Sequence, residues 1–257
     1  MKNVFGYPEF DAEGEEILCT YDNAYSDMLM DIRVYRMEPG RKRGFCRRGE
    51  ETAVLLLSGT VTFGWEGRTE TVSRRDVFTD GPYALHACAG EEITVEAQTD
   101  AEILVQCTKN DTAFSGRLYR PEDAPWVYSC VGKFGNVAKR RVNTIFDKDI
   151  APWSNMVLGE VLNDRGNWSG YLPHRHPQPE CYYFKFDRPE GFGASFVGDQ
   201  VFKSVDNSFG FSLQTGVMHA NRAGDIDPYI VPFLMSKGME LDDILHGLSK
   251  NGGLLGV

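Results

Sequence analysis

The stretch ETAVLLLSGTVTFGWEG at residues 51–67 decides the fold class. Its first run is apolar and rich in β-branched residues and ends at Ser58–Gly59. Its second run alternates apolar and polar residues up to Glu66–Gly67. Alternation with a period of two is typical of a strand, and both breaks carry residues that favour turns. The stretch therefore predicts a strand, a turn and a second strand.

The same pattern continues along the chain. EITVEAQ (92–98) and AEILVQCT (101–108) are predicted strands, and DGPYALHACAG (80–90) is predicted to be a connecting loop. Near the C-terminus, MELDDILHGLS (239–249) has apolar residues at helical spacing, followed by a lysine and two glycines that favour helix termination. The chain is therefore predicted to be mainly β, with one helix near its end.

A change of composition divides the chain. Over residues 114–127 two prolines and several charged residues interrupt the strand pattern, which favours a boundary or a crossover. Strand patterns then return at 156–162, 181–186 and 229–235. Two β-barrel or sandwich halves, at residues 1–120 and 121–257, would account for the length.

Charge and hydrophobicity limit the partners. The 257 residues are 42% hydrophobic and carry a formal net charge of -10, and the basic run RKRGFCRR (41–48) is short. Nucleic-acid binding needs clustered positive charge, so small solutes are the expected partners. No apolar stretch approaches the roughly 20 residues that span a bilayer, and the N-terminus lacks the apolar core of a signal peptide. We expect a cytoplasmic protein with no membrane or nucleic-acid partner.

The cysteines are scattered through the chain. No two of the six form a C-x-x-C pair, so a disulfide framework is not expected. Cys46 and Cys181 could act as ligands or nucleophiles, but a cysteine in or beside an apolar strand is more often a small core residue. We assign none of them a role.

The segment GYLPHRHPQPECYYFKF (170–186) carries the candidate site. Alternate residues of a strand share a face, so His174 and His176 point the same way. The prolines that follow turn the chain, so that Glu180 can return beside the two histidines. A fourth donor could come from His219 in LQTGVMHAN, where a glycine supports a tight turn just before the histidine.

These four side chains make a candidate metal site. Three imidazoles and one carboxylate suit one divalent metal per chain, of the Zn, Mn, Fe, Co or Ni class, with positions left for water or substrate. A lone histidine is usually structural. The tight H-x-H-x3-E cluster is what favours metal binding over a structural role for this set. His86, in the predicted loop, and His246, on the predicted helix, are expected to be structural.

H-x-H-x3-E followed by G-x-x-H resembles the two metal motifs of the cupin superfamily. More narrowly, GEVLNDRGNWSGYLPHRHPQPECYYFKFDRPEGFG (159–193) resembles the 5-deoxyglucuronate isomerases of inositol breakdown. In the first half, EETAVLLLSGTVTFGWEG (50–67) and RRDVFTDGPYAL (74–85) look like the first barrel of that family. The resemblance implies an all-β protein of two tandem cupin barrels. In it, 1–120 would be a barrel without a metal, because CRRGEE (46–51) stands where an H-x-H pair would be, and 121–257 would hold the metal.

The resemblance also implies a reaction. The expected activity is a metal-dependent aldose-ketose isomerisation of a deoxyuronate, from 5-deoxy-D-glucuronate to 5-dehydro-2-deoxy-D-gluconate. Glu180 and Tyr182 are the candidate catalytic residues, because Tyr182 shares the strand face of Glu180. The related 4-deoxy-5-ketouronate isomerases, an Fe(II) cupin dioxygenase and a non-catalytic sugar-binding cupin stay open as alternatives.

Two further expectations concern the substrate and the assembly. The substrate carboxylate calls for a cationic side chain, and Arg175, Arg188 and Arg222 lie near the motifs without a basis for ranking them. Arg47 or Arg48 could bind an anion in the first half. We expect a homo-oligomer, because the exposed edges of barrel strands favour association unless they are covered.

Overall fold

A computed structural model describes residues 6–23, 25–170, 174, 176–193 and 229–251. It divides the chain into two compact units, Met1–Val197 and Gly198–Val257. Each unit is treated separately below. The predicted division into two barrels at residues 120 and 121 stays a prediction.

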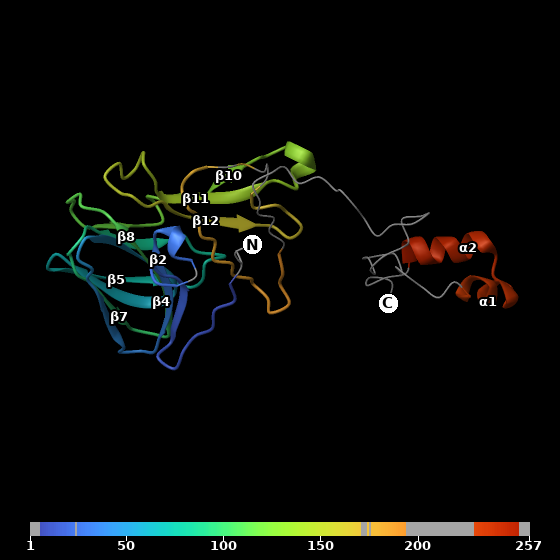
Figure 1. Cartoon of the computed structure of the whole chain (residues 1–257), viewed down its shortest axis with the longest axis horizontal. Coiled ribbons are helices and arrows are strands. Elements are labelled where there is room, and N and C mark those ends of the chain that lie inside the picture. Colours follow the sequence, from blue (N-terminus) through green and yellow to red (C-terminus); the bar gives the residue numbers. More distant parts are fainter. Residues whose placement is uncertain (1–5, 24, 171–173, 175, 194–228, 252–257) are drawn as a thin grey trace. The chain divides into compact units, whose positions relative to one another are not determined.

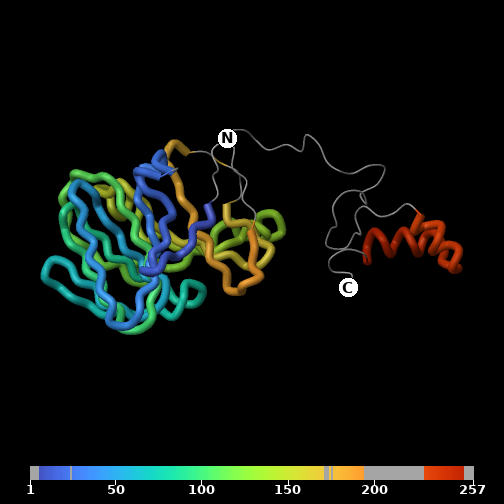
Figure 2. Tube along the Cα trace, turned by 60° about the horizontal axis from the view of Figure 1, so that its bottom comes forward, coloured from blue at the N-terminus to red at the C-terminus, as the bar shows by residue number. Residues whose placement is uncertain are grey.

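Nine strands form the first part of the N-terminal unit (Figure 1). They are β1 (Glu15–Cys19), β2 (Asp31–Met37), β3 (Lys42–Phe45), β4 (Glu50–Trp65), β5 (Arg68–Arg74), β6 (Tyr83–Ala87), β7 (Ile93–Ala97), β8 (Ala101–Lys109) and β9 (Arg117–Tyr119). One layer has the order β1-β2-β8-β4-β6-β9, while β5, β7 and β3 form the other layer around the second half of β4. All of these pairings are antiparallel, and Figure 2 shows the strands wrapping around a common interior.

The long strand β4 joins the two layers. Its first half pairs with β6 and β8, and its second half pairs with β5 and β7. The predicted turn at Ser58–Gly59 is wrong, because the chain passes from one layer to the other there through a register shift between Leu56 and Ser58. Gly59 has φ +98°, and a Cβ at this position would lie 2.4 Å from the Asp100 carbonyl oxygen, so glycine is required.

The second predicted turn is confirmed. Trp65 pairs with Arg68, which leaves Glu66 and Gly67 as a two-residue hairpin loop between β4 and β5. Both loop residues have positive φ, 45° and 72°. This is the backbone of a type I′ turn, whose twist matches that of the flanking strands.

Two apolar cores cover the two faces of the first layer. Val54 and Leu56 of β4 belong to the barrel interior, together with Phe63 and Ile103. The alternate residues Ala53, Leu55 and Leu57 belong to a second core on the other face. This double burial explains why residues 53–57 are continuously apolar, since a strand covered on both faces has no polar side.

The prediction that 80–90 is only a loop is wrong, because this stretch contains β6. His86 of β6 is therefore a strand residue, with 1% of its surface exposed. Its Nε2 lies 2.9 Å from Oε2 of the fully buried Glu51, and its ring stacks on Phe146 at a centroid distance of 4.4 Å. The structural role expected for His86 fits these contacts, and its position in a loop does not.

A separate three-stranded sheet follows the barrel in the chain. It consists of β10 (Val127–Ser129), β11 (Arg140–Phe146) and β12 (Leu158–Asn163), in that order. β12 confirms the predicted strand at 156–162. The predicted strand at 181–186 is wrong, because the backbone there is neither strand nor helix.

The described part of the unit Gly198–Val257 is helical. It contains α1 (Ile230–Ser236), α2 (Leu241–His246) and a π-helical turn, Gly247–Asn251. The predicted helix at 239–249 is confirmed, but the strand predicted at 229–235 is α1. Pro232 lies in the first turn of α1, where the missing N–H costs no hydrogen bond. Neither these helices nor any other in the described residues is long and apolar enough to cross a membrane.

Candidate functional site

His176 and Glu180 meet in the motif segment. The Nε2 atom of His176 lies 3.1 Å from Oε2 of Glu180, and Nδ1 lies 2.9 Å from the Gln178 carbonyl oxygen. A carbonyl only accepts, so Nδ1 carries a hydrogen and donates it to Gln178. Because Nδ1 carries the hydrogen, Nε2 faces the Glu180 carboxylate, and one cation can bind both groups. This contact is the predicted convergence of histidine and glutamate.

His174 lies near this pair. The ring centroids of His174 and His176 are 5.8 Å apart, and both residues and Glu180 are exposed. Within the described residues, no three His, Cys, Asp or Glu side chains gather closely enough to hold a metal ion. The predicted fourth donor, His219, lies outside the described residues, as do Arg175 and Arg222.

The chemical types of the donors nevertheless fit a divalent metal. Imidazole nitrogen and carboxylate oxygen are typical ligands of such metals. A metal-bound histidine usually donates its other N–H to a carbonyl or carboxylate, and the Nδ1–H of His176 does so to Gln178. His176 and Glu180 form the converging half of the predicted site, and His174 is the neighbouring donor.

The chain after Glu180 alternates between two surroundings. Tyr183 donates its hydroxyl to Oε2 of Glu16 at 3.3 Å, and Lys185 forms an ion pair with Glu102. Cys181 lies beside Cys19 of β1, and the hydrogen bond that the Cys19 thiol donates to Cys181, together with burial, raises the pKa of Cys19. Every second residue of 181–185 thus contacts the first layer of the barrel.

The intervening side chains are exposed. Tyr182 and Phe184 are each 54% exposed, Phe186 is 47% exposed, and the Tyr182 and Phe184 rings stack at a centroid distance of 6.0 Å. Burial of the hydroxyl and its hydrogen bond to Glu180 raise the pKa of Tyr182 to about 12. The candidate residues Glu180 and Tyr182 therefore lie in contact, although the strand on which they were predicted to share a face is not formed.

Arg188 is exposed and lies 3.9 Å from Glu190. Nothing in these contacts directs its guanidinium toward the motif histidines. Its predicted role with a substrate carboxylate stays a prediction.

A buried ion pair that the sequence did not reveal connects the barrel to the three-stranded sheet. Arg74 is fully buried and donates from Nη1 and Nη2 to the two carboxylate oxygens of Glu160, each at 2.8 Å. It also donates to the carbonyl oxygens of Leu56 and Asp80. Glu160 accepts a further bond from the Asn143 amide at 3.4 Å. No local pattern in the sequence identifies a partner 86 residues away.

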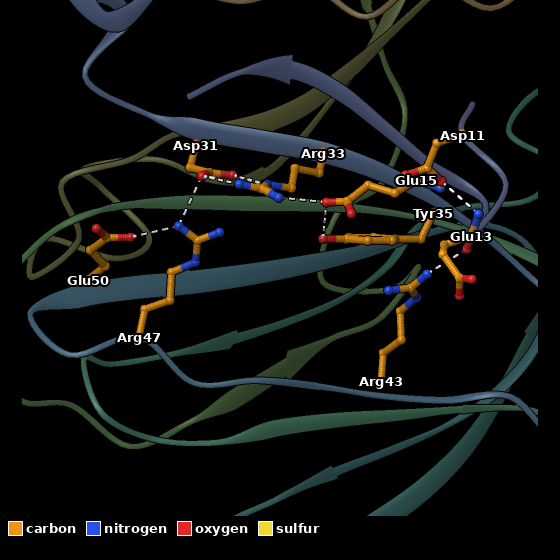
Figure 3. Close-up of polar contacts among 9 residues, drawn as sticks. All are labelled: Asp11, Glu13, Glu15, Asp31, Arg33, Tyr35, Arg43, Arg47 and Glu50. Atoms are coloured by element: carbon orange, nitrogen blue, oxygen red, sulfur yellow. Dashed lines mark hydrogen bonds and ion pairs between the residues drawn. The ribbon is translucent and has the colours of Figure 1, made fainter. Parts of the chain in front are cut away.

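Arg47 and Glu50 of the CRRGEE stretch belong to a charged network with Asp31 (Figure 3). Arg47 donates from Nη1 to Asp31 at 3.0 Å and to Glu50 at 3.4 Å. Arg33 contacts Asp31 from Nε at 2.7 Å. Guanidinium and carboxylate groups thus occupy the place where the sequence resemblance puts a histidine pair in metal-binding cupins.

Sequence comparison decides the family. The KduI/IolB family profile matches residues 7–209, which is most of the chain. The chain belongs to the KduI/IolB family. Two curated 5-deoxy-glucuronate isomerases are similar to this member: one from Geobacillus kaustophilus (strain HTA426), 30% identical over 63% of this chain, and one from Bacillus velezensis, 24% identical over 75% of both chains. This KduI/IolB chain spans only 61% of the length of the first relative.

The C-terminal quarter of this KduI/IolB member resembles a different family. The acetokinase family profile matches residues 190–257, and an acetate kinase from Geobacillus sp. (strain WCH70) is 43% identical over 68 residues, which are 26% of this chain and 17% of that protein. The boundary between the two compact units, at 197 and 198, falls inside the overlap of the two family matches. His219 lies in the part matched by the acetokinase profile alone.

Among solved structures, an IolB-like protein from Salmonella typhimurium LT2 is similar to the KduI/IolB chain. The match has a TM-score of 0.48 and 17% sequence identity, and it covers 54% of this chain and 52% of that one.

Proposed function

We propose that this chain is a metal-dependent aldose-ketose isomerase of a deoxyuronate, converting 5-deoxy-D-glucuronate to 5-dehydro-2-deoxy-D-gluconate. Membership of the KduI/IolB family and the names of the two curated relatives support an isomerase of this class. The observation that carries the proposal is the contact of His176 with Glu180 at 3.1 Å inside the family match. It brings together a nitrogen and a carboxylate donor on one side of the segment.

His174, His176 and Glu180 would hold the metal. When bound, a divalent metal supplies Lewis-acid stabilisation of the negative charge on the substrate's oxygens. His219 stays the predicted fourth ligand. Its place outside the range matched by the KduI/IolB profile weighs against it, so the proposal depends on the first three residues.

The proton transfer is assigned to the chain's own residues. An aldose-ketose isomerisation removes a proton from C2 and returns one to C1, so a base must carry it. Glu180 is the candidate base. Tyr182, whose hydroxyl donates a hydrogen bond to Glu180 and is protonated at neutral pH, would orient this carboxylate.

The test is an assay for ketose formation from 5-deoxy-D-glucuronate, with metal-stripped protein and with protein reconstituted with Zn, Mn, Fe, Co or Ni. We expect activity only after reconstitution and elemental analysis close to one metal per chain. The His174→Ala, His176→Ala double variant should lose both. His246→Ala is the matched control, because His246 is an exposed histidine at the end of α2 and should keep both.

Other outcomes would replace the proposal. Oxygen consumption with an aromatic or thiol substrate would favour an Fe(II) dioxygenase. Turnover of 4-deoxy-5-ketouronate alone would move the substrate within the related isomerases. Sugar-acid binding without turnover in the reconstituted protein would favour a non-catalytic binding protein.

We also propose that the protein forms a homo-oligomer. β12 is an edge strand of its sheet in the part of the chain that the structure describes, and exposed edges favour pairing. Sedimentation velocity at micromolar concentration would contradict this if it gave only monomer.

A further inference from the structure

A cavity of about 410 Å³ lies beside β3 in the first barrel. Three of its lining side chains are cationic, Lys42, Arg43 and Arg47, and none is acidic. The volume lies within the range of roughly 300–1,000 Å³ that is typical of small-ligand pockets. All of its lining belongs to residues 35–47, which are separate in sequence from the histidine motif.

Two of the three cations already have carboxylate partners. Arg47 contacts Asp31 and Glu50, and Lys42 forms an ion pair with Glu96 at 3.0 Å. Their positive charges are therefore largely balanced by the protein itself.

Arg43 has no such partner. Its Nη2 donates to the backbone carbonyl of Glu13 at 2.7 Å, and its guanidinium lies 4.4 Å from the centroid of the Tyr35 ring (Figure 3). Its Nε is buried without a hydrogen-bond partner, and no ion pair joins Arg43 to a carboxylate among the described residues. A backbone carbonyl and an aromatic face hold the side chain in place without neutralising it. Arg43 is therefore a positive charge at the cavity that no carboxylate of the described residues neutralises.

We propose that this cavity binds a small organic oxyanion, specifically a carboxylate, with Arg43 as its principal partner. A guanidinium without a carboxylate partner favours an oxyanion, to which it donates charge-assisted N–H···O bonds. A phosphate shares this chemistry, so the test separates the two anions. The site lies in the barrel for which the sequence predicted no metal, and it does not depend on the proposed isomerase activity.

Three hexoses that differ at one carbon provide the probes. D-Glucuronate carries a carboxylate, D-glucose carries a neutral hydroxymethyl group in its place, and D-glucose 6-phosphate carries a phosphate. Titration calorimetry with the full chain should show binding of glucuronate and none of glucose. Using a His176→Ala background separates this cavity from the proposed active site. Binding of glucose as tight as that of glucuronate, or binding of the phosphate alone, would overturn the assignment.

Cys46 gives a local readout that needs no substitution in the cavity. It lines the cavity and is exposed, whereas Cys130 lies on the loop after β10. Glucuronate should slow alkylation of Cys46, measured by peptide mass spectrometry, and leave the rate at Cys130 unchanged. Equal rates at Cys46 with and without glucuronate would contradict a ligand in this cavity.

Variants at two arginines complete the test. Arg43→Gln should weaken glucuronate binding about tenfold or more, and Arg43→Lys, which keeps the charge without the planar fork, should weaken it less. Arg48→Gln is the matched control, because Arg48 is exposed and does not line the cavity. Thermal unfolding of each variant identifies any that has lost its fold. Undiminished binding by a folded Arg43→Gln variant would refute the proposal.

Discussion

The first barrel and the three-stranded sheet β10-β11-β12 differ in how their faces are covered. In the barrel, strands such as β4 bury both faces, and Val54 and Leu56 have no exposed surface. In the smaller sheet, Ile145, Phe146 and Leu158 are buried against the barrel's outer core, whereas Val127 is 62% and Val161 is 41% exposed.

The candidate catalytic residues lie outside the closely packed barrel interior. The barrel has the sealed packing that stabilises a fold, and the H-x-H-x3-E segment lies instead beside exposed aromatic side chains. The KduI/IolB match ends at residue 209, and the acetokinase match begins at residue 190, soon after the segment that carries the candidate site. Stability is therefore expected to reside in the first barrel and chemistry in the region that follows it.

The largest expected effect tests where the stability resides. Phe63→Ala removes a ring with no exposed surface from the barrel interior and should lower the free energy of unfolding by about 3–5 kcal/mol. Phe184→Ala, in the exposed face, should change it by less than about 0.5 kcal/mol. Urea denaturation followed by tryptophan fluorescence measures both. Equal losses would mean that the exposed face is packed in solution.

The next effect tests the connection between the two regions. Arg74→Met leaves the Glu160 carboxylate without its partner and should cost about 3 kcal/mol, because an unpaired charge stays partly buried. Arg75→Met is the matched control. Its side chain is 73% exposed and pairs with Asp80 at the surface, so the cost should stay below about 1 kcal/mol. If the two variants were equally stable, the buried pair would contribute nothing net.

A smaller effect tests whether the exposed face is functional. Tyr182→Phe removes one hydroxyl that contacts Glu180 and should lower turnover about tenfold, a loss of roughly 1.4 kcal/mol of transition-state stabilisation. Metal content should not change. Phe184→Tyr, the reverse substitution two residues along, adds a hydroxyl on the same face and should leave turnover unchanged. Full activity of Tyr182→Phe would show that Tyr182 only lines the surface.

The smallest effect concerns pH and the contact between the motif segment and the barrel. Burial raises the pKa of Glu16 above its usual 4.5, and the nearby Glu102 adds to this rise. Between the unfolded and the folded pKa of Glu16, the folded protein therefore holds a proton that the unfolded chain has lost. The contribution of Glu16 to stability is therefore complete below about pH 4.5 and declines as the pH rises through its folded pKa.

Glu16→Gln should remove this decline, because the amide stays neutral. Urea midpoints at pH 4, 5, 6 and 7 measure it. Glu13→Gln serves as the control, since Glu13 is exposed and pairs with Arg41 at the surface. A decline with pH that is the same in both variants would assign it to other groups.

Local patterns predicted part of the fold, namely β4, β7, β8 and β12 among the described strands. Alternation gave the strands at 92–98, 101–108 and 156–162, and the glycine after Glu66 gave the hairpin. The turn at Ser58–Gly59 failed because a glycine that permits a register shift looks in sequence like one that ends a strand. The strand predicted at 229–235 is helix α1 instead: isoleucine and valine favour strands, but Pro232 lies in a helical first turn, which tolerates it.

The candidate site was predicted only in part. The contact of His176 with Glu180 joins residues that the sequence placed together in one short segment. The contact of Tyr182 with Glu180 was not predicted, because the strand on which their shared face was argued is not formed. The ion pair of Arg74 with Glu160 and the buried contact of His86 with Glu51 join residues far apart in the chain. Alternation gives the face of a strand but not the residue opposite, so neither pair could be named from the sequence.

The sharing of β4 between two layers has a consequence for synthesis on the ribosome. Its partners β5, β6, β7 and β8 all follow it in the chain, and the last of them ends at Lys109. At translation rates of about 5–20 residues per second, the apolar run of β4 waits several seconds for β8 after it has left the peptidyl-transferase centre. During that time it is a bare β-strand segment of the kind that aggregates or recruits chaperones. The strand that joins the two layers of the finished barrel is thus without its partners until the later strands have been synthesised.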